Sequence, residues 1–427
     1  MLFGTSWTKK LSSTLQKLDS SQNPEQICRV IIEYANRRNE RIGALVASRQ
    51  GRVRRELKIV PSLAVELPLA VLEELARSRD VKYIWNDAEV KTMLNYTVPE
   101  VGSLLAQEAG YTGKDTVAAI IDTGIGLHPD LTTPDNRIIG WNDLVNEQTS
   151  PYDDNGHGTH IAGIIAGNGY SSQGKYKGMA PEAELVGVKV LDKNGSGNIS
   201  DVISGIEWCI DHQTEYRIKA LNLSLGATAD ESYRDDPLCR ATTAAWLSRI
   251  TVCAAAGNSG PESGTISTPG INPTIITVGN LDDGRTLAPE DDSLNDSSSR
   301  GPTIDNLVKP DFLAPGTKIT SLRPNKGYQE MTGTSMSTAV ATGAALQLGQ
   351  KWPDKKPDEI KKILMDNARN LDLAPNLQGS GTLDLSPIFS QEKGSPESQS
   401  QNVIIKNKLS PITVIALLII LYLVIER

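Results

Sequence analysis

Phenylalanine and cysteine are both scarce in this chain of 427 residues, which holds 3 Phe and 4 Cys against 36 Gly. The scarcity of aromatic side chains predicts a core of small and aliphatic residues, with close approaches between backbone segments. The cysteines form no CxxC pair, which excludes a disulfide scaffold and favours free thiols in a reducing compartment. Because 39% of the residues are apolar, the chain is neither collagen-like nor wholly disordered.

A surplus of positive charge is also missing, since the formal net charge is −8 at pH 7. Nucleic-acid binding depends on clustered Lys and Arg, so this balance argues against a general nucleic-acid binder. The charge is uneven, because residues 1–95 carry 16 basic and 11 acidic side chains and the remainder carries 27 and 40. The length predicts about two to four domains. A basic N-terminal domain docked on an acidic one fits the counts, although two independently solvated surfaces would give the same numbers.

The two ends of the chain differ. The N-terminus has no apolar stretch with a small-residue cleavage site, so no secretory signal is predicted, and Leu11, Leu15 and Leu18 predict a short amphipathic helix. Residues 409–425 are 17 residues without a charge, near the lower limit of the roughly 17–25 that span a bilayer. We expect a single-pass membrane anchor here, with a buried core helix or an interfacial helix as alternatives. Positive-inside counting places the larger part of the chain in the cytoplasm.

The hydrophobic pattern changes along the chain. Residues 25–95 predict a β-α-β-β-α-β module, with elements at 26–34, 38–50, two runs within 56–67, 70–78 and 81–85. From residue 113 onward short apolar strands alternate with helices, which predicts a mostly parallel sheet covered on both faces. Strands are expected at 116–122, 184–190, 220–225, 250–256 and 275–278, and helices at 157–166, 200–211, 238–248, 335–348 and 357–367. Residues 86–99 show no strong pattern, and 290–299 predict an acidic surface insertion.

Three polar side chains mark ends of these elements. Asp122 follows an apolar strand, His157 opens the helix in DDNGHGTHIAG, and Ser335 opens another in GTSMS. A serine hydroxyl becomes a good nucleophile when a neighbouring imidazole accepts its proton, and a buried carboxylate then holds that imidazole in the right tautomer. Asn258, on the Gly-flanked loop AAAGNSG, supplies an amide donor of the kind an oxyanion hole requires. Together these residues indicate acyl-transfer chemistry.

In this order and context the motifs resemble the subtilisin-like serine proteases, or subtilases. The resemblance runs from about residue 111 to 385 through DTGI, HGTHIAG, LNLSLG, AAAGN, SSRGP and GTSMS. It implies a three-layer α/β fold with a mostly parallel central sheet, preceded by a small ferredoxin-like α+β propeptide domain. The expected divisions are 1–24 as an extension, 25–95 as propeptide, 96–389 as catalytic domain, 390–408 as a polar linker and 409–427 as the anchor.

Carried onto this sequence, the resemblance implies a serine endopeptidase. Asp122 would orient His157, His157 would act as general base and acid, Ser335 would be the nucleophile and Asn258 would complete the oxyanion hole. It also implies two edges that pair with an extended protein or peptide substrate, and an apolar pocket beside one of them. The residues carried over for these edges and the pocket are Ser224, Leu225, Gly226, Gly195, Ser196, Gly197 and Ile199.

The resemblance further implies a precursor. The N-terminal module would assist folding, cap the cleft as an intramolecular inhibitor and then be cut off between residues 91 and 98. No cofactor is implied for catalysis. Calcium commonly stabilises such enzymes, and Asp130 with residues 167–177 lie where a site would form, although few carboxylates converge there. One departure is in the nucleophile helix, where Thr338, Ala339 and Val340 stand in place of the usual Pro-containing continuation.

Other interpretations of these residues have less support. His157 and His160 lie three apart and suit one helix face, but no HExxH motif is present, so His160 is expected to be structural. GTSMS lacks the second Gly of a GxSxG nucleophile elbow, which removes the main support for an α/β-hydrolase. The surviving alternative is a catalytically silent binding or signalling protein of the same fold that retains its propeptide.

Overall fold

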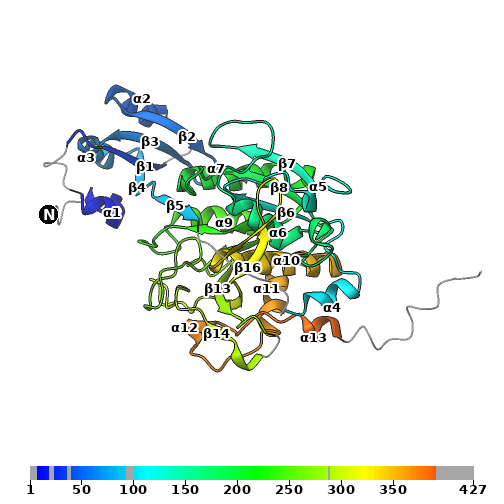
Figure 1. Ribbon diagram of the computed structural model, residues 1–427. Helices are drawn as coiled ribbons and strands as arrows, with labels where there is room; N and C mark the ends of the chain where they lie inside the picture. The colour runs from blue at the N-terminus through cyan, green and yellow to red at the C-terminus, as the bar shows by residue number, and fades with distance from the viewer. Residues whose placement is uncertain (1–6, 19–23, 36–39, 93–100, 287–288, 391–427) are drawn as a thin grey trace, which may run out of the picture. The chain divides into compact units, whose positions relative to one another are not determined.

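An eight-stranded sheet forms the centre of the computed structural model (Figure 1). Its strand order is β14-β13-β12-β10-β6-β8-β7, and β15 pairs with β13 beside this path. Neighbours are parallel except β13 and β14, which confirms the expectation from the continuous apolar runs. The strands are β6 Val117–Asp122, β7 Ile138–Asp143, β8 Glu184–Lys189, β10 Ile218–Leu223, β12 Thr251–Ala255, β13 Ile276–Asp282, β14 Ser293–Leu294 and β15 Phe312–Pro315.

Helices pack on this sheet in two pairs. Helix α6 (His157–Ala166) packs against α10 (Thr334–Lys351), and α7 (Ile199–Asp211) packs against α9 (Pro237–Leu247). The pairs form separate layers, which gives the predicted three-layer α/β architecture. Residues 157–166 and 334–348 are buried throughout, which accounts for their small and apolar composition. The remaining α-helices of this part are α4 Ser103–Glu108, α5 Pro129–Thr132, α8 Gln213–Tyr216, α11 Pro357–Asp366, α12 Pro375–Gln378 and α13 Ser386–Phe389.

The predicted β-α-β-β-α-β pattern is confirmed in the N-terminal module, by which we mean the described part of residues 24–88. Its antiparallel sheet has the order β2-β3-β1-β4. Alternating buried side chains of β1 and β4 pack on the helices to form a core of their own. The elements are β1 Ile27–Tyr34, α2 Glu40–Ser48, β2 Arg52–Leu57, β3 Ser62–Pro68, α3 Leu72–Arg77 and β4 Val81–Asn86.

One local expectation was wrong, and the structure adds detail to two others. The leucine spacing near the N-terminus does not form one helix, because Leu11 is extended and bridges Ile84 of β4, between the 3-10 turn Thr8–Lys10 and α1 (Ser13–Gln16). The segment without a pattern contains strand β5 (Glu89–Thr92), which pairs with distant strands. The predicted surface insertion at 290–299 lies mostly at the surface, although Ser298 near its end is fully buried and its hydroxyl accepts the N–H of Asn280.

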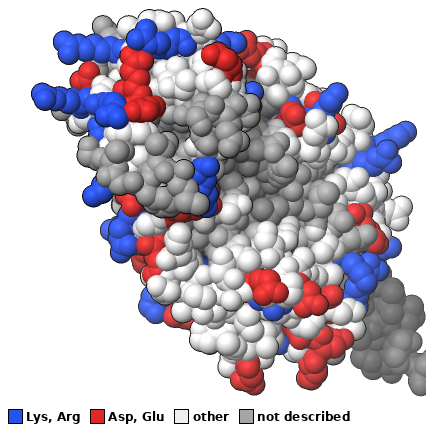
Figure 2. Space-filling view, turned by 90° about the vertical axis from the view of Figure 1, so that its left-hand side faces the viewer, with Lys and Arg blue, Asp and Glu red and all other residues white. Residues whose placement is uncertain are grey.

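The structure describes residues 7–18, 24–35, 40–92, 101–286 and 289–390, which belong to one compact unit ending at Ser390. Within these ranges no helix has the length and apolar character needed to cross a bilayer. The predicted anchor at 409–427 and nearly all of the predicted linker lie outside the described residues. Figure 2 shows Lys and Arg side chains projecting from the upper part of the view, at the level of the N-terminal module, with Asp and Glu among them, and mainly Asp and Glu near the bottom. This distribution matches the uneven charge of the sequence.

Candidate active site

Asp122 and His157 form a hydrogen-bonded pair at the carboxyl end of the parallel sheet. Asp122 is the last residue of β6, and His157 is the first residue of α6. His157 Nδ1 lies 2.7 Å from Asp122 Oδ1, and both side chains are fully buried. The same carboxylate oxygen accepts the backbone N–H of Thr123 at 2.7 Å. With Nδ1 engaged by the carboxylate, Nε2 is the nitrogen that can exchange a proton with a reacting group.

A second carboxylate, that of Asp153, joins the start of α6 to the end of β6. Its Oδ1 accepts the Thr123 hydroxyl at 2.9 Å and the N–H groups of Asn155 and Gly156 at 3.1 and 2.8 Å. Its Oδ2 accepts the N–H and the hydroxyl of Thr159 at 2.9 and 2.6 Å. Asp153 therefore determines where His157 begins its helix. Sequence reasoning missed this residue, and the only available signal was the acidic pair in DDNGH.

A close backbone contact supports the same junction. A Cβ atom at Gly158 would lie 2.1 Å from the carbonyl oxygen of Gly124, a separation that no side chain tolerates. Gly124 itself has a φ of +119°, which favours glycine. Glycine is therefore required at position 158, because any side chain there would keep α6 from approaching the loop after Asp122.

Ser335 lies at the start of α10, and its side chain is fully buried. Its hydroxyl donates to the carbonyl oxygen of Ser224 at 3.1 Å, and the Ser224 hydroxyl donates to the Ser335 carbonyl at 2.8 Å. Within the described residues no hydrogen bond joins Ser335 to His157, although α6 and α10 pack together. Catalytic hydrogen bonds often tighten only when a substrate is present. In this state the nucleophile candidate is held by the predicted substrate edge.

Asn258 stands beside the start of α10, on the loop that follows β12. Its side-chain Oδ1 accepts the N–H and the hydroxyl of Thr334 at 3.0 and 3.1 Å. The Thr334 hydroxyl in turn accepts the N–H of Gly257 at 3.3 Å. Because Oδ1 is fixed by Thr334, the Nδ2 end of the amide is directed away from it as a donor. A preorganised amide donor next to the nucleophile is the arrangement that stabilises an oxyanion.

His160 has a structural environment, as expected. It is fully buried, and its Nε2 lies 3.0 Å from the carbonyl oxygen of Ile319. Burial, helped by the neighbouring His157, lowers the pKa of His160 to about 3, so the ring is neutral at physiological pH. In the described ranges no three His, Cys, Asp or Glu side chains are grouped to hold a metal ion. The four cysteines are free thiols, and burial raises the pKa of Cys253 to about 12, which argues against a thiolate nucleophile.

The chain's own strand β5 occupies the two predicted substrate edges. It is the middle strand of a three-stranded antiparallel sheet with the order β11-β5-β9. On the side of β11 (Leu225–Gly226), Lys91 is opposite Gly226 and Thr92 is opposite Leu225. The backbone of residues 89–92 therefore takes the place that an extended peptide would take.

The second edge is β9 (Ser196–Asn198), on the other side of β5. The opposed pairs are Glu89–Asn198, Val90–Gly197 and Lys91–Ser196. Gly195 turns the chain into this strand with a φ of +74°, and its N–H donates to the carbonyl oxygen of Asp192 at 2.9 Å. Ile199 follows β9 as a buried residue at the start of α7, and its N–H donates to the carbonyl oxygen of Ala88. The structure thus brings both predicted edges together around one strand.

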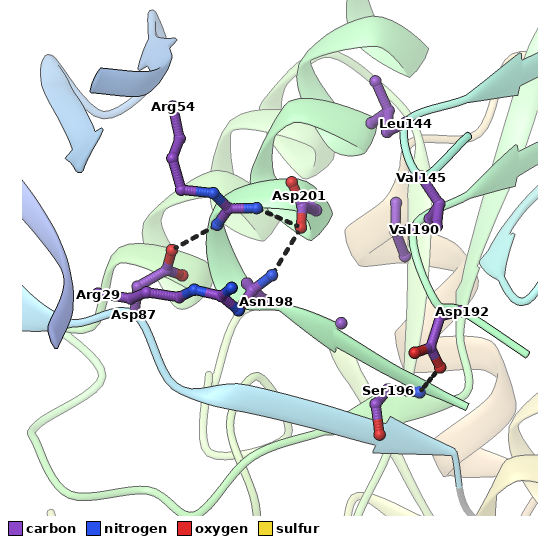
Figure 3. A pocket seen from close by; sticks show the side chains of 11 residues that line it. Arg29, Arg54, Asp87, Leu144, Val145, Val190, Asp192, Ser196, Asn198 and Asp201 are labelled. Atoms are coloured by element: carbon purple, nitrogen blue, oxygen red, sulfur yellow. Dashed lines mark hydrogen bonds and ion pairs between the residues drawn. The ribbon is translucent and has the colours of Figure 1, made fainter. Parts of the chain in front are cut away.

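Charged side chains join the N-terminal module to α7. The carboxylate of Asp87 accepts the N–H and the hydroxyl of Ser200 at 3.0 and 2.7 Å. Arg55 Nε lies 2.6 Å from Asp201 Oδ1, and Arg54 lies between Asp87 and Asp201 at one wall of a cavity of about 430 Å³ (Figure 3). Burial raises the pKa of Asp87, opposed by its two bonds from Ser200. Asp87 therefore satisfies backbone and hydroxyl donors at the first turn of α7.

Further along α7, Glu207 binds the loop between β2 and β3. Its Oε1 accepts the backbone N–H groups of Lys58 and Ile59 at 2.5 and 2.8 Å. A carboxylate that accepts two N–H groups makes a charge-assisted contact of higher strength than a neutral hydrogen bond. The module is thus attached to α7 near the first turn and again in its middle.

The residues expected near a calcium ion do not fit one. Asp130 Oδ1 accepts the N–H of Ser171 at 2.8 Å, and its Oδ2 accepts the hydroxyl of Tyr328 at 2.8 Å. Arg137 adds a cation close by, since its guanidinium donates to the carbonyl oxygens of Ala166 and Ala183. Both oxygens of the single carboxylate therefore accept hydrogen bonds from protein donors, and the Arg137 guanidinium also donates to the backbone carbonyl oxygen of Asp130.

A buried carboxylate and imidazole beside a helix-start serine, on this three-layer fold, define a serine protease of the subtilisin type. Residues 113–381 match the Subtilase family model, and the chain belongs to this family. Serine protease AprX of Bacillus subtilis (strain 168) is 43% identical over 340 residues, which cover 74% of this chain and 76% of that protein. An alkaline protease of Alkalihalobacillus alcalophilus is 34% identical over 332 residues, which cover 77% and 79%. The chain is therefore a subtilisin-type serine endopeptidase.

A solved structure supports the fold. The crystal structure of fervidolysin from Fervidobacterium pennivorans covers 89% of this chain with a TM-score of 0.69 and 21% identity. This chain spans 62% of that protein's length. At 21% sequence identity this similarity supports the fold alone.

Proposed function

We propose that Ser335 attacks the carbonyl carbon of a peptide bond while His157 Nε2 takes its proton. Asp122 holds the imidazole and stabilises the imidazolium, and the protonated His157 then donates to the leaving amine. The Asn258 amide and the N–H of Ser335 bind the developing oxyanion. Water then hydrolyses the ester on Ser335, with His157 again as the base. The observation that carries this proposal is the buried 2.7 Å contact between Asp122 and His157 at the sheet end that faces α10.

We further propose that residues 25–95 act as an inhibitor-type propeptide. The support is the position of β5 between β9 and β11, because a strand there excludes any other peptide. The term cap is used below for the N-terminal module together with β5. The cap is covalently joined to the enzyme until a bond after β5 is cut, so one chain is first the substrate and then the inhibitor.

The register of β5 supports one bond as the cut. Thr92 is opposite Leu225, and Ser224 precedes Leu225 with its carbonyl oxygen 3.1 Å from Ser335 Oγ. In an antiparallel register one step forward along one strand corresponds to one step back along the other, so we extrapolate from Thr92 opposite Leu225 to the next position in sequence opposite Ser224. We therefore propose hydrolysis of the bond that follows Met93, within the interval of 91–98 expected from the sequence.

The decisive experiment compares purified wild type with Ser335→Ala. Wild type should release the cap, show a new N-terminus at Leu94 and react with a fluorophosphonate probe. Ser335→Ala should remain intact and unlabelled, because the only nucleophile has been removed. An intact, unlabelled wild type would instead support the silent binding protein. Cap release in purified Ser335→Ala would contradict self-processing.

We also propose that the tail anchors the enzyme to a membrane. The support is the run of 17 uncharged residues at 409–425, separated from the enzyme by a polar stretch. The chain expressed with its tail should stay in the membrane pellet after alkaline carbonate extraction, and a chain ending at residue 390 should not. Release of the full chain into the supernatant would contradict the anchor and favour an interfacial helix.

A further inference from the structure

We infer that residues 7–18 are a working part of the inhibitor, and that they latch the cap onto the 229–236 loop of the enzyme. This inference rests on the proposed precursor function, and it adds a second site at which the inhibitory segment is attached to the enzyme. The segment, called the N-terminal latch below, precedes the β-α-β-β-α-β pattern and has no role in the catalytic chemistry. Its apolar side faces the cap, and its polar side faces the enzyme.

The apolar side of the latch completes the core of the cap. Trp7, Leu11 and Leu15 are each at most 5% exposed and belong to the same buried cluster as Val30 and Ile84. These are large apolar surfaces for a module of this size, and removing them would uncover the side chains beneath. The latch is therefore built into the cap rather than lying loosely on it.

Backbone and side-chain hydrogen bonds fix the latch to the edge of the cap's sheet. Leu11 bridges Ile84 of β4, and the N–H of Ser12 donates to the carbonyl oxygen of Ile84 at 2.9 Å. Lys10 Nζ donates to the carbonyl oxygens of Ser78 and Val81, each at 2.7 Å. The latch thus covers part of an otherwise open strand edge.

The polar side of the latch contacts the enzyme. The N–H of Ser13 donates to Glu231 Oε1 at 2.7 Å, and the Ser13 hydroxyl donates to the carbonyl oxygen of Asp230 at 3.2 Å. The hydroxyl of Thr14 donates to the Asp230 carboxylate. These contacts link residues more than 200 positions apart, so they report docking rather than local chain geometry.

The loop that receives the latch is held firmly by the enzyme. The hydroxyl of Ser232 and the N–H of Tyr233 donate to the two oxygens of Asp305 at 2.7 and 3.0 Å. At its end, Asp236 accepts the N–H of Cys239 at 2.7 Å and so caps α9. The loop therefore presents Glu231 as a preorganised acceptor, which lowers the entropy cost of docking.

A further ion pair joins the cap to α9, the helix that follows the loop bound by the latch. Arg240, on α9, lies 3.0 Å from Glu33 Oε1 on β1, and its guanidinium is 5.9 Å from the ring centre of Trp85. Among the described residues, the cap contacts the enzyme at the substrate edges, along α7, at Leu144 after β7 and at α9, and the latch adds the loop before α9. Cutting after β5 breaks the covalent link and leaves these non-covalent contacts in place. We expect the latch to keep the cut cap bound to the enzyme.

Ser13 offers a matched pair of substitutions. Ser13→Pro removes the N–H that Glu231 accepts, whereas Ser13→Ala keeps it and removes only the hydroxyl. Proline is tolerated because Ser13 is the first residue of α1, and Ser12 has φ −59° and ψ 155°, which suits a residue before proline. Both variants yield the same mature enzyme as wild type, since the changed residue leaves with the cap.

The experiment measures the rate of fluorophosphonate labelling of the purified, processed full-chain complex. Ser13→Pro and Glu231→Ala should each speed labelling about five- to tenfold, because a charge-assisted hydrogen bond is lost, and Ser13→Ala about twofold or less. The double variant Ser13→Pro/Glu231→Ala should be no faster than Ser13→Pro alone, because both substitutions remove the same Ser13–Glu231 hydrogen bond. Equal rates for Ser13→Pro and Ser13→Ala, or multiplied effects in the double variant, would overturn the inference.

A second measurement separates this inference from the proposed function. Hydrogen exchange of the uncut Ser335→Ala chain requires no catalysis, and in it Ser13→Pro should raise exchange in residues 7–18 several-fold relative to Ser13→Ala. If wild type were never labelled, the proposed function would fail while this comparison still decided whether the latch docks. Unchanged exchange would refute the latch even in an active enzyme.

Discussion

Replacing Asp153 by Asn should weaken both the fold and the catalyst, because one carboxylate connects β6, the following loop and α6. Its two oxygens accept five hydrogen bonds, three at Oδ1 and two at Oδ2. Asparagine retains one acceptor oxygen and places an NH₂ group against the N–H of Thr159, so at least one buried donor loses its partner. Loss of that bond and of the charge on the others should cost about 3–4 kcal/mol.

The assay for this cost is thermal unfolding in a Ser335→Ala background, which prevents self-digestion. For a unit of this size the loss corresponds to a fall in Tm of about 4–7 °C. In the active enzyme the displaced His157 should lower kcat about 10- to 100-fold with little change in KM, because the substrate edges are untouched.

Two controls limit the interpretation. Asp135→Asn makes the same charge change at an exposed position and should shift stability by less than about 0.5 kcal/mol. Thr159→Ser preserves both bonds to Asp153 and should behave like wild type. If Asp153→Asn lowered Tm by less than about 2 °C and left kcat within about twofold, the proposed junction would be refuted.

Three other predictions follow from the described contacts. His160 has its pKa lowered to about 3 against about 6.5 in the unfolded chain, so its contribution to stability is full above about pH 6.5 and is lost as the pH drops toward 3. His160→Gln should therefore reduce the fall in Tm between about pH 6.5 and about pH 3. An unchanged dependence of Tm on pH in this variant would contradict the prediction. EDTA should leave the Tm of wild type unchanged, and a Tm that depends on the chelator would show that a cation is bound. Tyr328→Phe should lower the free energy of unfolding by about 1–3 kcal/mol, because the Asp130 carboxylate loses a hydrogen-bond donor. Glu207→Ala should weaken inhibition by the cut cap about tenfold or more and Glu207→Gln less, as measured by the inhibition constant, and equal effects would argue against a role for the charge.

The sequence was sufficient for five of the eight central strands, for the long helices and for the Asp122–His157 pair, because their signals are local. A run such as VAAIID is buried on both faces, and polar groups at parallel strand ends converge on one edge. The Asn258 side chain accepts the N–H of Thr334, the residue before Ser335 in the chain. The catalytic roles of these residues remain predictions for the experiments above.

The remaining features depend on contacts that no local pattern encodes. Strand β5 has four residues and no apolar period, and its partners are more than 100 positions away. Asp153 and Asp154 look equivalent in sequence, yet the first binds α6 and the second lies 2.6 Å from Lys189 Nζ. Lys189 is fully buried in an apolar strand, where the carbonyl oxygens of Thr123 and Leu191 complete its hydrogen bonds. Only the folded chain distinguishes such pairs.

The position of β5 between two enzyme strands has a consequence for the selection of substrate proteins. A segment that enters there must offer both of its backbone edges at once, and residues inside a native helix or a central strand have those groups already engaged. Cleavage therefore samples the fraction of time that a target segment is locally open. For a target that opens and closes faster than it is cut, each ~1.4 kcal/mol of lost local stability raises its turnover about tenfold. For such substrates, the cleavage rate of the mature enzyme would depend more on the local stability of the substrate protein than on its amino-acid sequence.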